Sequence, residues 1–425
     1  MSDKRSSGRA PRGCCSIAAG ISLFAVLSVA FFWIRGSTNP SLVVPAKIPL
    51  AINGFDKLRN AATLVTGTDP YSSTNPDPAA ETKYVNANQR ALAAARNALT
   101  YPYLDMSQRS PYALFPHFAQ YRNVARLFAS DGRVKTRANN YAGAADASLD
   151  AIQLGETVPK GCTLIGKLVG IACEAIGRRP LYQVIPHLTA ADCRRICKRY
   201  ETLCQKHVPE SETFTEEKYC GQESLLLIFR GGLTASSLLG STNGQSTSGL
   251  DALAQLYFLV HSKRSMMESY TSYMDQLAAL SDKPWPMAKT APSIPTDPIL
   301  SILEPSYSEA NFKDIEASVT QNALCLTAIA LQGYKMEHCS YPAALDKLIP
   351  TYLSRVPNDP FTANSQITYR RSGSTFILYS IGPDGVDDGG KPIDDPSKAT
   401  KTNPRARYFA NKDSKGDILF GTNIY

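Results

Sequence analysis

The spacing of apolar residues between residues 78 and 281 most constrains what this chain can fold into. Several segments repeat apolar side chains at intervals of three and four residues, among them "FAQYRNVARLFASDGRV", "TLIGKLVGIACEAIG" and "AADCRRICKRYETLCQKH". Such spacing places the apolar side chains on one face of an α-helix. Turn residues such as Pro159-Lys160-Gly161 separate the segments. The pattern predicts an all-helical domain over residues 78–281.

A stretch without charged side chains, Cys14 to Ile34, precedes this region. About 20 apolar residues suffice to cross a bilayer as a helix. Basic residues lie before the stretch and are sparse just after it, which favours a cytoplasmic tail over residues 1–13. A cleaved signal peptide is the alternative, although its apolar region is typically shorter. We expect a single-pass anchor over residues 14–34, then a tether over residues 35–77 and a periplasmic or extracellular ectodomain.

Composition and charge bound the classes of partner. The chain has 425 residues, of which 43% are hydrophobic, so it can bury one or two substantial cores. The formal net charge is +8, from 45 basic and 37 acidic residues. No run of five or more Lys or Arg occurs, and arginines do not alternate with aromatic residues. We therefore expect no nucleic-acid partner.

The cysteines after the anchor share predicted helix faces. Cys193, Cys197 and Cys204 lie at i, i+4 and i+11, and Cys162 and Cys173 repeat the i+11 relation. In an oxidising compartment such faces can be joined by disulfides, and in a reducing one they are buried thiols. Zinc is disfavoured because no C-x-x-C motif occurs and the histidines lack ligand spacing. Both disulfides and thiols stay open.

A proline-rich segment over residues 282–307 predicts a linker and a second domain over residues 308–425. The domain begins with a helical pattern, "NFKDIEASVTQNALCLTAIALQGYKMEHCSYP", and continues with the β-rich runs "QITYRR", "TFILYSI" and "GDILFG". The predicted fold class is α+β: an N-terminal transmembrane helix, an all-helical middle domain, and a C-terminal helix with a small antiparallel sheet.

One helical segment, "RANNYAGAADASLDAIQLGETV", resembles the second half of a tetratricopeptide unit. No 34-residue repeat accompanies it, and helical arrays need about three repeats to bury a continuous core. An irregular helical bundle is the alternative. The resemblance implies a scaffolding or protein-binding role for the middle domain.

The C-terminal region resembles the globular domain of the type II secretion major pseudopilins. The resemblance covers residues 310–420 and rests on "YPAALDKLIPTYLSRVPNDPF", "ITYRRSGSTFILYSIGPDGVDDGG" and "GDILFG" in that order. It implies a long helix packed on a small antiparallel sheet, with a calcium ion in the last loop. The N-terminal "RGCCSIAAGISLF" lacks the processed Phe and the following Glu of pseudopilins. We therefore do not expect a filament subunit.

The loop from Gly382 to Asp395 is rich in aspartate and glycine. Ca²⁺ prefers about six to eight oxygen ligands from carboxylates, carbonyls and water. An EF-hand does not fit, because Val386 occupies a ligand position and a strand precedes the loop. A metal-free turn is the alternative, with basic residues downstream compensating the carboxylates. The resemblance places the carbonyl of Ile381 and the carboxylate of Asp384 on the ion, then Asp417, with Asp387, Asp388 and Asp394 competing for the remaining positions.

No catalytic constellation is evident in the sequence. Neither a G-x-S-x-G nor an H-E-x-x-H motif occurs. We expect a non-enzymatic protein that binds a protein partner in the cell envelope or secretion machinery. The alternative is an enzyme with a cleft between the helical and sheet domains. Convergent titratable groups in such a cleft would favour chemistry.

Overall fold

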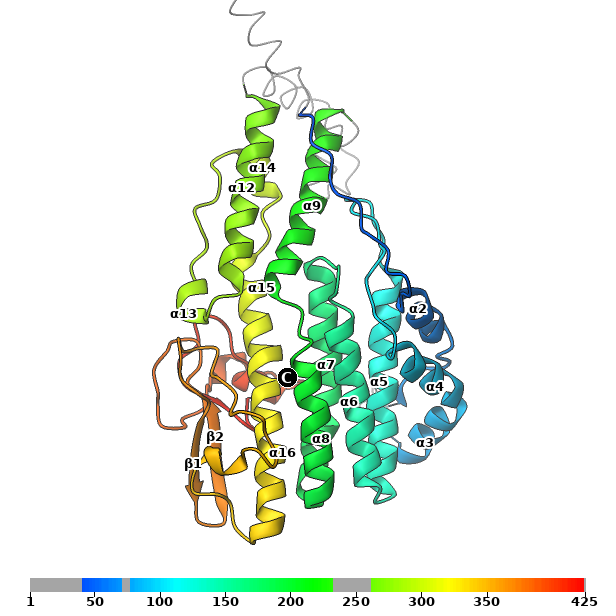
Figure 1. Cartoon of the computed structure of the whole chain (residues 1–425), viewed down its shortest axis with the longest axis vertical. Helices are drawn as coiled ribbons and strands as arrows, with labels where there is room; N and C mark the ends of the chain where they lie inside the picture. The colour runs from blue at the N-terminus through cyan, green and yellow to red at the C-terminus, as the bar shows by residue number, and fades with distance from the viewer. Residues whose placement is uncertain (1–39, 71–76, 232–260, 424–425) are drawn as a thin grey trace, which may run out of the picture. The chain divides into compact units, whose positions relative to one another are not determined.

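The computed structural model describes residues 40–70, 77–231 and 261–423, and most of them are helical (Figure 1). The chain divides into two compact units. Of the described residues, the smaller unit holds 40–44, 221–231, 261–272 and 294–303, and the larger unit holds 45–70, 77–220, 273–293 and 304–423. The core, the cavities and the sites described below belong to the larger unit.

The helices of the larger unit begin at recognisable caps. Asp77 accepts a hydrogen bond from the backbone N–H of Ala79, and Pro78 follows as the first helical residue. Asn140 and Thr189 cap later helices in the same way. The helices are α2 Phe55–Thr63, α3 Pro78–Ala87, α4 Gln89–Ala98, α5 Pro116–Arg137, α6 Tyr141–Thr157, α7 Leu164–Val184, α8 Ala190–Cys204, α13 Trp285–Ala288, α15 Tyr307–Lys313 and α16 Gln321–His338.

Three further helices reach into the smaller unit or lie in it. Helices α9 Glu210–Phe229 and α12 Lys263–Ser281 have residues in both units, and α14 Pro298–Ile302 lies in the smaller one. The segment that resembles a tetratricopeptide half-unit forms α6, which packs against both α5 and α7.

Glycines allow α6 and α7 to approach closely. A Cβ on Gly155 would lie 2.6 Å from the carbonyl oxygen of Gly170 and 2.5 Å from Cγ of Glu174. A Cβ on Gly170 would lie 2.5 Å from the carbonyl oxygen of Gly155. Only residues without a side chain fit at this crossing. The close approach brings Glu156 of α6 towards Glu174 of α7.

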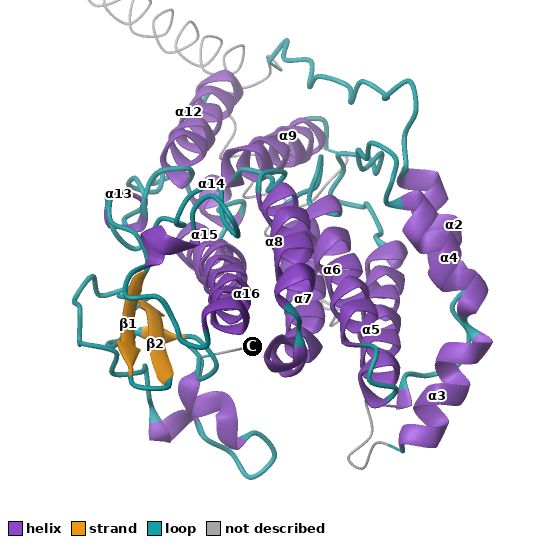
Figure 2. Cartoon of the chain, turned by 60° about the horizontal axis from the view of Figure 1, so that its bottom comes forward, coloured by secondary structure: helices purple, strands orange, loops and turns teal. Residues whose placement is uncertain are grey.

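One hydrophobic core joins the helices to the sheet. Helix α16 packs against α8 on one side and against the second strand on the other, as Figures 1 and 2 show. The core includes Ile152 of α6, Tyr200 of α8, Leu324 of α16 and Leu378 of the sheet. Residues of the ranges 78–281 and 308–425 therefore share one core. Trp285, from the segment predicted as a linker, is 2% exposed and belongs to the same core.

The sheet is small and antiparallel. Its strands are β1 Thr368–Ser372, β2 Thr375–Ser380 and β3 Ile418–Leu419, in the order β1-β2-β3. Tyr379 pairs with Thr368 on one side and with Leu419 on the other. The Asp/Gly-rich loop leaves the end of β2 and the chain returns as β3.

A π-helix, Asp314–Thr320, lies between α15 and α16. Single π-turns inside α-helical segments frequently mark functional sites. Here the π-helix carries the buried side chains of Asp314 and Ser318, and its Ala317 carbonyl accepts a hydrogen bond from Arg178.

The predicted fold class requires a correction. In residues 40–70, 77–231 and 261–423, no helix combines the length and the apolar composition needed to cross a membrane. The segment 14–34, predicted as the transmembrane helix, lies outside these residues. The long helices carry charged residues throughout, for example Lys167, Glu174 and Arg178 in α7. The corrected description is a mostly helical chain with one small three-stranded antiparallel sheet.

The cysteines in the described part of the chain are free thiols. Cys193 and Cys197 point from α8 into the core, and Cys325 of α16 is buried with them. The predicted face of α8 therefore holds the buried thiols of Cys193 and Cys197 and the partly buried thiol of Cys204. The predicted face shared by Cys162 and Cys173 is wrong, because Cys162 lies in the turn before α7. No disulfide joins the described cysteines.

Candidate functional site

A stripe of charged side chains runs along the buried face of α7. Lys167, Glu174 and Arg178 lie at i, i+7 and i+11, so they share one face of the helix. Each is 2% exposed. A buried charge is costly unless it is paired and hydrogen-bonded. The stripe therefore requires partners from the neighbouring elements.

Asn322 of α16 lies at the centre of this network. Its Nδ2 donates to Oε1 of Glu156 at 3.2 Å and to Oε2 of Glu174 at 2.8 Å. Its Oδ1 accepts from Arg178 at 2.6 Å and from the hydroxyl of Tyr200 at 2.9 Å. All hydrogen-bonding positions of the amide are thus used. Asn322 links α6, α7, α8 and α16 through a single side chain.

Glu174 is held near the midpoint of its titration at neutral pH. Its Oε2 accepts from Ser318 at 2.7 Å and from Arg178 at 3.1 Å, in addition to Asn322. Burial, and then the negative charge of Glu156, raise the pKa of Glu174 to about 7. The carboxyl group is therefore partly protonated under ordinary conditions.

His207 bridges two carboxylates on different elements. Its Nδ1 lies 2.9 Å from Oε2 of Glu156, and its Nε2 lies 3.1 Å from Oδ2 of Asp314. Burial alone would lower the pKa of His207, but Asp314 and Glu156 outweigh burial and hold this pKa well above its ordinary value. The ring is therefore an imidazolium whose nitrogens both donate, and neither is available as a base.

Lys167 completes the charged cluster. Its Nζ lies 3.0 Å from Oδ1 of Asp314 and 3.5 Å from Oε2 of Glu210, and it donates to the carbonyl of Val208 at 2.7 Å. Burial would raise the pKa of Asp314, but Lys167 and His207 outweigh burial and lower this pKa below its usual range. Asp314 is therefore ionised at any ordinary pH.

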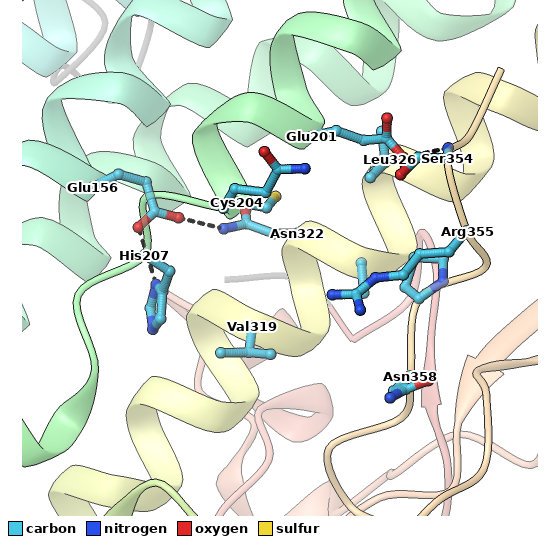
Figure 3. Close-up of a pocket in the computed structure, with 13 residues that line it drawn as sticks. Glu156, Glu201, Cys204, His207, Val319, Asn322, Leu326, Ser354, Arg355 and Asn358 are labelled. Carbon is cyan, nitrogen blue, oxygen red and sulfur yellow. Dashed lines mark hydrogen bonds and ion pairs between the residues drawn. The ribbon is translucent and has the colours of Figure 1, made fainter.

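A first cavity of about 290 Å³ opens beside this network (Figure 3). In Figure 3 the Glu156–His207 pair and Asn322 form one wall, and the guanidinium of Arg355 points into the cavity from the opposite side. Within the described residues, Arg355 makes no ion pair. The lining residues come from α6, α8 and the segment after it, the π-helix, α16 and the 354–358 segment: Glu156, Glu201, Cys204, Gln205, His207, Val319, Asn322, Ala323, Leu326, Ser354, Arg355, Pro357 and Asn358.

A second cavity, of about 450 Å³, shares His207, Val319 and Asn358 with the first. Its walls are more acidic than basic. We call the two cavities together the cleft. The second cavity is lined by His207, Pro209, Glu210, Ser281, Asp282, Lys283, Pro284, Asp314, Ile315, Val319, Asn358, Asp359, Pro360, Thr362, Ala363 and Asn364.

The residues predicted as calcium ligands lie apart from the cleft, at the end of β2. Asp417 is fully buried and accepts from the backbone N–H of Asp388 at 3.3 Å and of Gly390 at 2.6 Å. Asp384 accepts from Val386 at 3.2 Å and from the N–H of Gly416, next to Asp417, at 3.3 Å. The structure thus brings Asp384 and Asp417 to the same turn.

The other predicted ligands have different partners. Asp387 accepts from the hydroxyl of Tyr379 at 2.9 Å, and Asp394 forms a two-pronged ion pair with Arg407 at 2.5 and 2.7 Å. The backbone N–H of Ile381 donates to Asp359 at 2.9 Å. Asp394 is neutralised by Arg407 and does not join Asp417.

The fit of this loop to a metal can be judged from its donors. The oxygens of Asp384 and Asp417 already accept backbone N–H groups, which stabilise a carboxylate as a cation would. Burial, together with the charges of Asp387 and Asp388, raises the pKa of Asp417. In the part of the chain that the structure describes, no group of three or more His, Cys, Asp or Glu side chains is arranged around a metal position. The calcium site stays a prediction.

The sequence analysis assigned no role to the residues of the cleft. A signal was present in α7, because Lys167, Glu174 and Arg178 interrupt the apolar "TLIGKLVGIACEAIGRR" at helical spacing. No comparable signal marks His207 or Asp314, whose partners are distant in sequence. The geometry is the guide to the function of the cleft, because no family model, no curated protein and no solved structure matches this chain.

Proposed function

We propose that this chain binds a small polar molecule in the cleft, and that Arg355 holds an anionic group of that molecule. The observation that carries the proposal is the guanidinium of Arg355, which points into the first cavity without an ion-pair partner among the described residues. Arginine suits planar anionic groups such as carboxylates because it presents a fork of N–H donors.

The opposite wall supports a binding site because it is held in place before any ligand arrives. Asn322 and the Glu156–His207 pair are fixed by the buried network, so they lose little freedom when a ligand binds. Small-molecule sites typically combine apolar walls with a few fixed polar groups. Val319, Ala323 and Leu326 supply the apolar part of this wall.

Binding is better supported than covalent chemistry in the first cavity. Both nitrogens of His207 are engaged by carboxylates. Burial holds the pKa of the Cys204 thiol well above its ordinary value, so the thiolate that a nucleophile requires is scarce. The Cys204 thiol and the His207 ring, which both line the first cavity, therefore do not act as a nucleophile and its base.

The test compares anions with neutral molecules of the same shape. Carboxylates of about three to six carbons should raise the thermal unfolding midpoint of the full chain, because a ligand of the folded state stabilises it. The corresponding alcohols, at matched ionic strength, should not. The variant R355A should lose the response, and R355K should keep part of it. R405A, at an arginine that is exposed as Arg355 is but lines neither cavity, should respond as the parent does.

Two results would overturn the proposal. One is a midpoint that no carboxylate raises in the parent chain. The other is an R355A variant whose response equals that of the parent.

A further inference from the structure

Buried polar atoms without hydrogen-bond partners concentrate beside the second cavity. Most of the buried side-chain N and O atoms that lack such a partner in the described residues belong to one group. Each atom of this kind costs about 1–3 kcal/mol if it stays unpaired. A concentration of them indicates partners outside the chain, either ordered water or a ligand. The atoms are Oε1 and Oε2 of Glu210, Oγ1 of Thr213, the hydroxyl of Tyr307, and Nδ2 and Oδ1 of Asn311. Oε2 of Glu210 also lies 3.5 Å from Nζ of Lys167, and Oδ1 of Asp314 forms an ion pair with the same ammonium at 3.0 Å.

Helix geometry and contacts bring these residues together. Tyr307, Asn311 and Asp314 lie at i, i+4 and i+7, so they share a face of α15 and its continuation. Glu210 and Thr213 lie within one turn at the start of α9. The rings of Phe214 and Tyr307 are 5.1 Å apart, which joins the two faces.

The two carboxyl groups of the cluster face the second cavity. Glu210 and Asp314 both line it, and both lie close to the ammonium of Lys167. Glu210 is 3% exposed. A ligand in the second cavity can therefore contact both carboxyl groups.

Charge in this cluster is balanced only when Glu210 keeps its proton. Lys167 of α7 and His207 before α9 carry positive charges, and Asp314 and Glu156 carry negative ones. Burial raises the pKa of Glu210, and the negative charge of Asp314 raises it further. Lys167 and His207 lower this pKa, but they are outweighed, and the result is a pKa of about 8. The other titratable groups around the cluster are Tyr307 of α15 and three residues that line the second cavity, Asp282, Lys283 and Asp359.

We propose that the second cavity binds the ammonium group of an organic amine in exchange for the acidic proton of Glu210. The ammonium donates up to three hydrogen bonds, and the carboxyl oxygens of Glu210 and Asp314, which both line the cavity, offer acceptors. The O–H bond of Glu210 breaks, its proton leaves to the buffer, and its carboxylate pairs with the bound ammonium. The charge of the cluster is the same before and after.

This inference names the ligand class for the cleft and rests on its proposed binding function. A molecule with a carboxylate for Arg355 and an amine for Glu210 would use both cavities, which share His207, Val319 and Asn358. A divalent metal ion is a poorer occupant because Lys167 lies 3.0 Å from Oδ1 of Asp314. The ammonium of Lys167 would repel a doubly charged metal ion more strongly than a singly charged ammonium group.

The experiment titrates the full chain with propylammonium chloride by calorimetry, in two buffers of different ionisation enthalpy. With the pKa of Glu210 at about 8, each bound amine should release about 0.9 proton at pH 7 and about 0.1 proton at pH 9. The affinity should rise about tenfold from pH 6 to pH 7 and level off above pH 8. Sodium chloride at equal ionic strength is the blank.

Two variants test whether the released proton comes from Glu210. E210Q should lose both the amine affinity and the proton release, and E309Q, at an exposed residue of α15, should keep both. Glutamine resembles the protonated acid, so E210Q should fold, and circular dichroism checks this. If E210Q does not fold, two measurements on the parent chain decide whether the inference holds: the number of protons released per bound amine and the pH dependence of the amine affinity.

The possible outcomes separate this inference from the proposed function. Absence of amine binding, binding without proton release, or an unchanged E210Q would overturn the inference. If propanoate still stabilises the parent through Arg355 in that case, the binding function stands alone. If the amine binds with proton release but no carboxylate depends on Arg355, the proposed function falls and the amine site stands.

Discussion

Replacing Asn322 with leucine should destabilise the chain strongly, although leucine has a similar volume and suits a buried helix. The amide makes four hydrogen bonds, at 2.6 Å to Arg178, 2.8 Å to Glu174, 2.9 Å to Tyr200 and 3.2 Å to Glu156. N322L removes all of them at once. Its partners stay buried, each with a hydrogen-bonding position left empty.

The expected loss follows from the kinds of partner. A hydrogen bond to a charged group contributes about 1.5–3 kcal/mol, and one to a neutral group about 0.5–1.5 kcal/mol. Counting Arg178, Glu174 and Glu156 as charged partners and the Tyr200 hydroxyl as a neutral one gives a simple sum of about 5–10 kcal/mol. Bonds within one network are not additive, and removing one member of a buried charged network typically costs about 3–5 kcal/mol. We expect a loss of about 4 kcal/mol, against a total stability of about 5–15 kcal/mol.

The measurement is urea unfolding of the full chain followed by far-UV circular dichroism. The matched control is T327V on the same helix, because Thr327 is fully buried and its hydroxyl has no hydrogen-bond partner. Valine keeps the shape and removes the unpaired group, so T327V should be neutral or stabilising by up to about 1 kcal/mol. A loss below about 1 kcal/mol for N322L would refute the reasoning that the network depends on this amide.

Three further predictions concern other parts of the larger unit. G155A should destabilise by about 1–3 kcal/mol because its Cβ would overlap α7, and G132A, where the nearest atom lies at 3.3 Å, should be close to neutral in the same urea assay. The free energy of unfolding should fall as the pH rises from about 4.5 to about 7, because Glu174 keeps its proton in the folded state up to a pKa of about 7 but loses it near 4.5 in the unfolded state. E174Q should lose less stability over this range. An equal or larger loss would contradict the assignment of this pH dependence to Glu174. Millimolar calcium should raise the thermal midpoint if the Asp/Gly-rich loop binds it; D417N should abolish the rise, D394N should not, and a parent chain that shows no rise would remove calcium from the account.

The helices and strands follow from local sequence, but their assembly does not. The apolar spacing places helices over residues 78–231, and "TFILYSI" contains β2. The proline-rich segment suggests a linker, yet Trp285 within it packs on Phe312 and Phe361. Proline content reports local backbone geometry and not burial. The burial of α16 can be predicted better than that of Trp285. The sequence "ALCLTAIAL" is apolar on all sides of the helix, and such a helix must be covered on all sides.

The cleft could be predicted only in part. The charged stripe of α7 can be read from the sequence, and it implies buried partners. The identity of those partners cannot, because Glu156, His207 and Asp314 come from three separate elements. For the Asp/Gly-rich loop, the residue types are the same for a metal site and for turns that cap their own backbone. The N–H groups that Asp384 and Asp417 accept are visible only in three dimensions.

The π-helix also fixes the rotational phase between α15 and α16. An α-helix turns about 100° per residue, so a single deletion within residues 314–320 that restored α-helical winding would swing everything before it through about that angle. Tyr307, Asn311 and Asp314 would then leave the side of Lys167 while Asn322 stayed in place. Phe312, which belongs to the same hydrophobic core as Leu324, would turn with them. The length of residues 314–320 therefore determines both how α15 packs and where Asp314 lies in the second cavity.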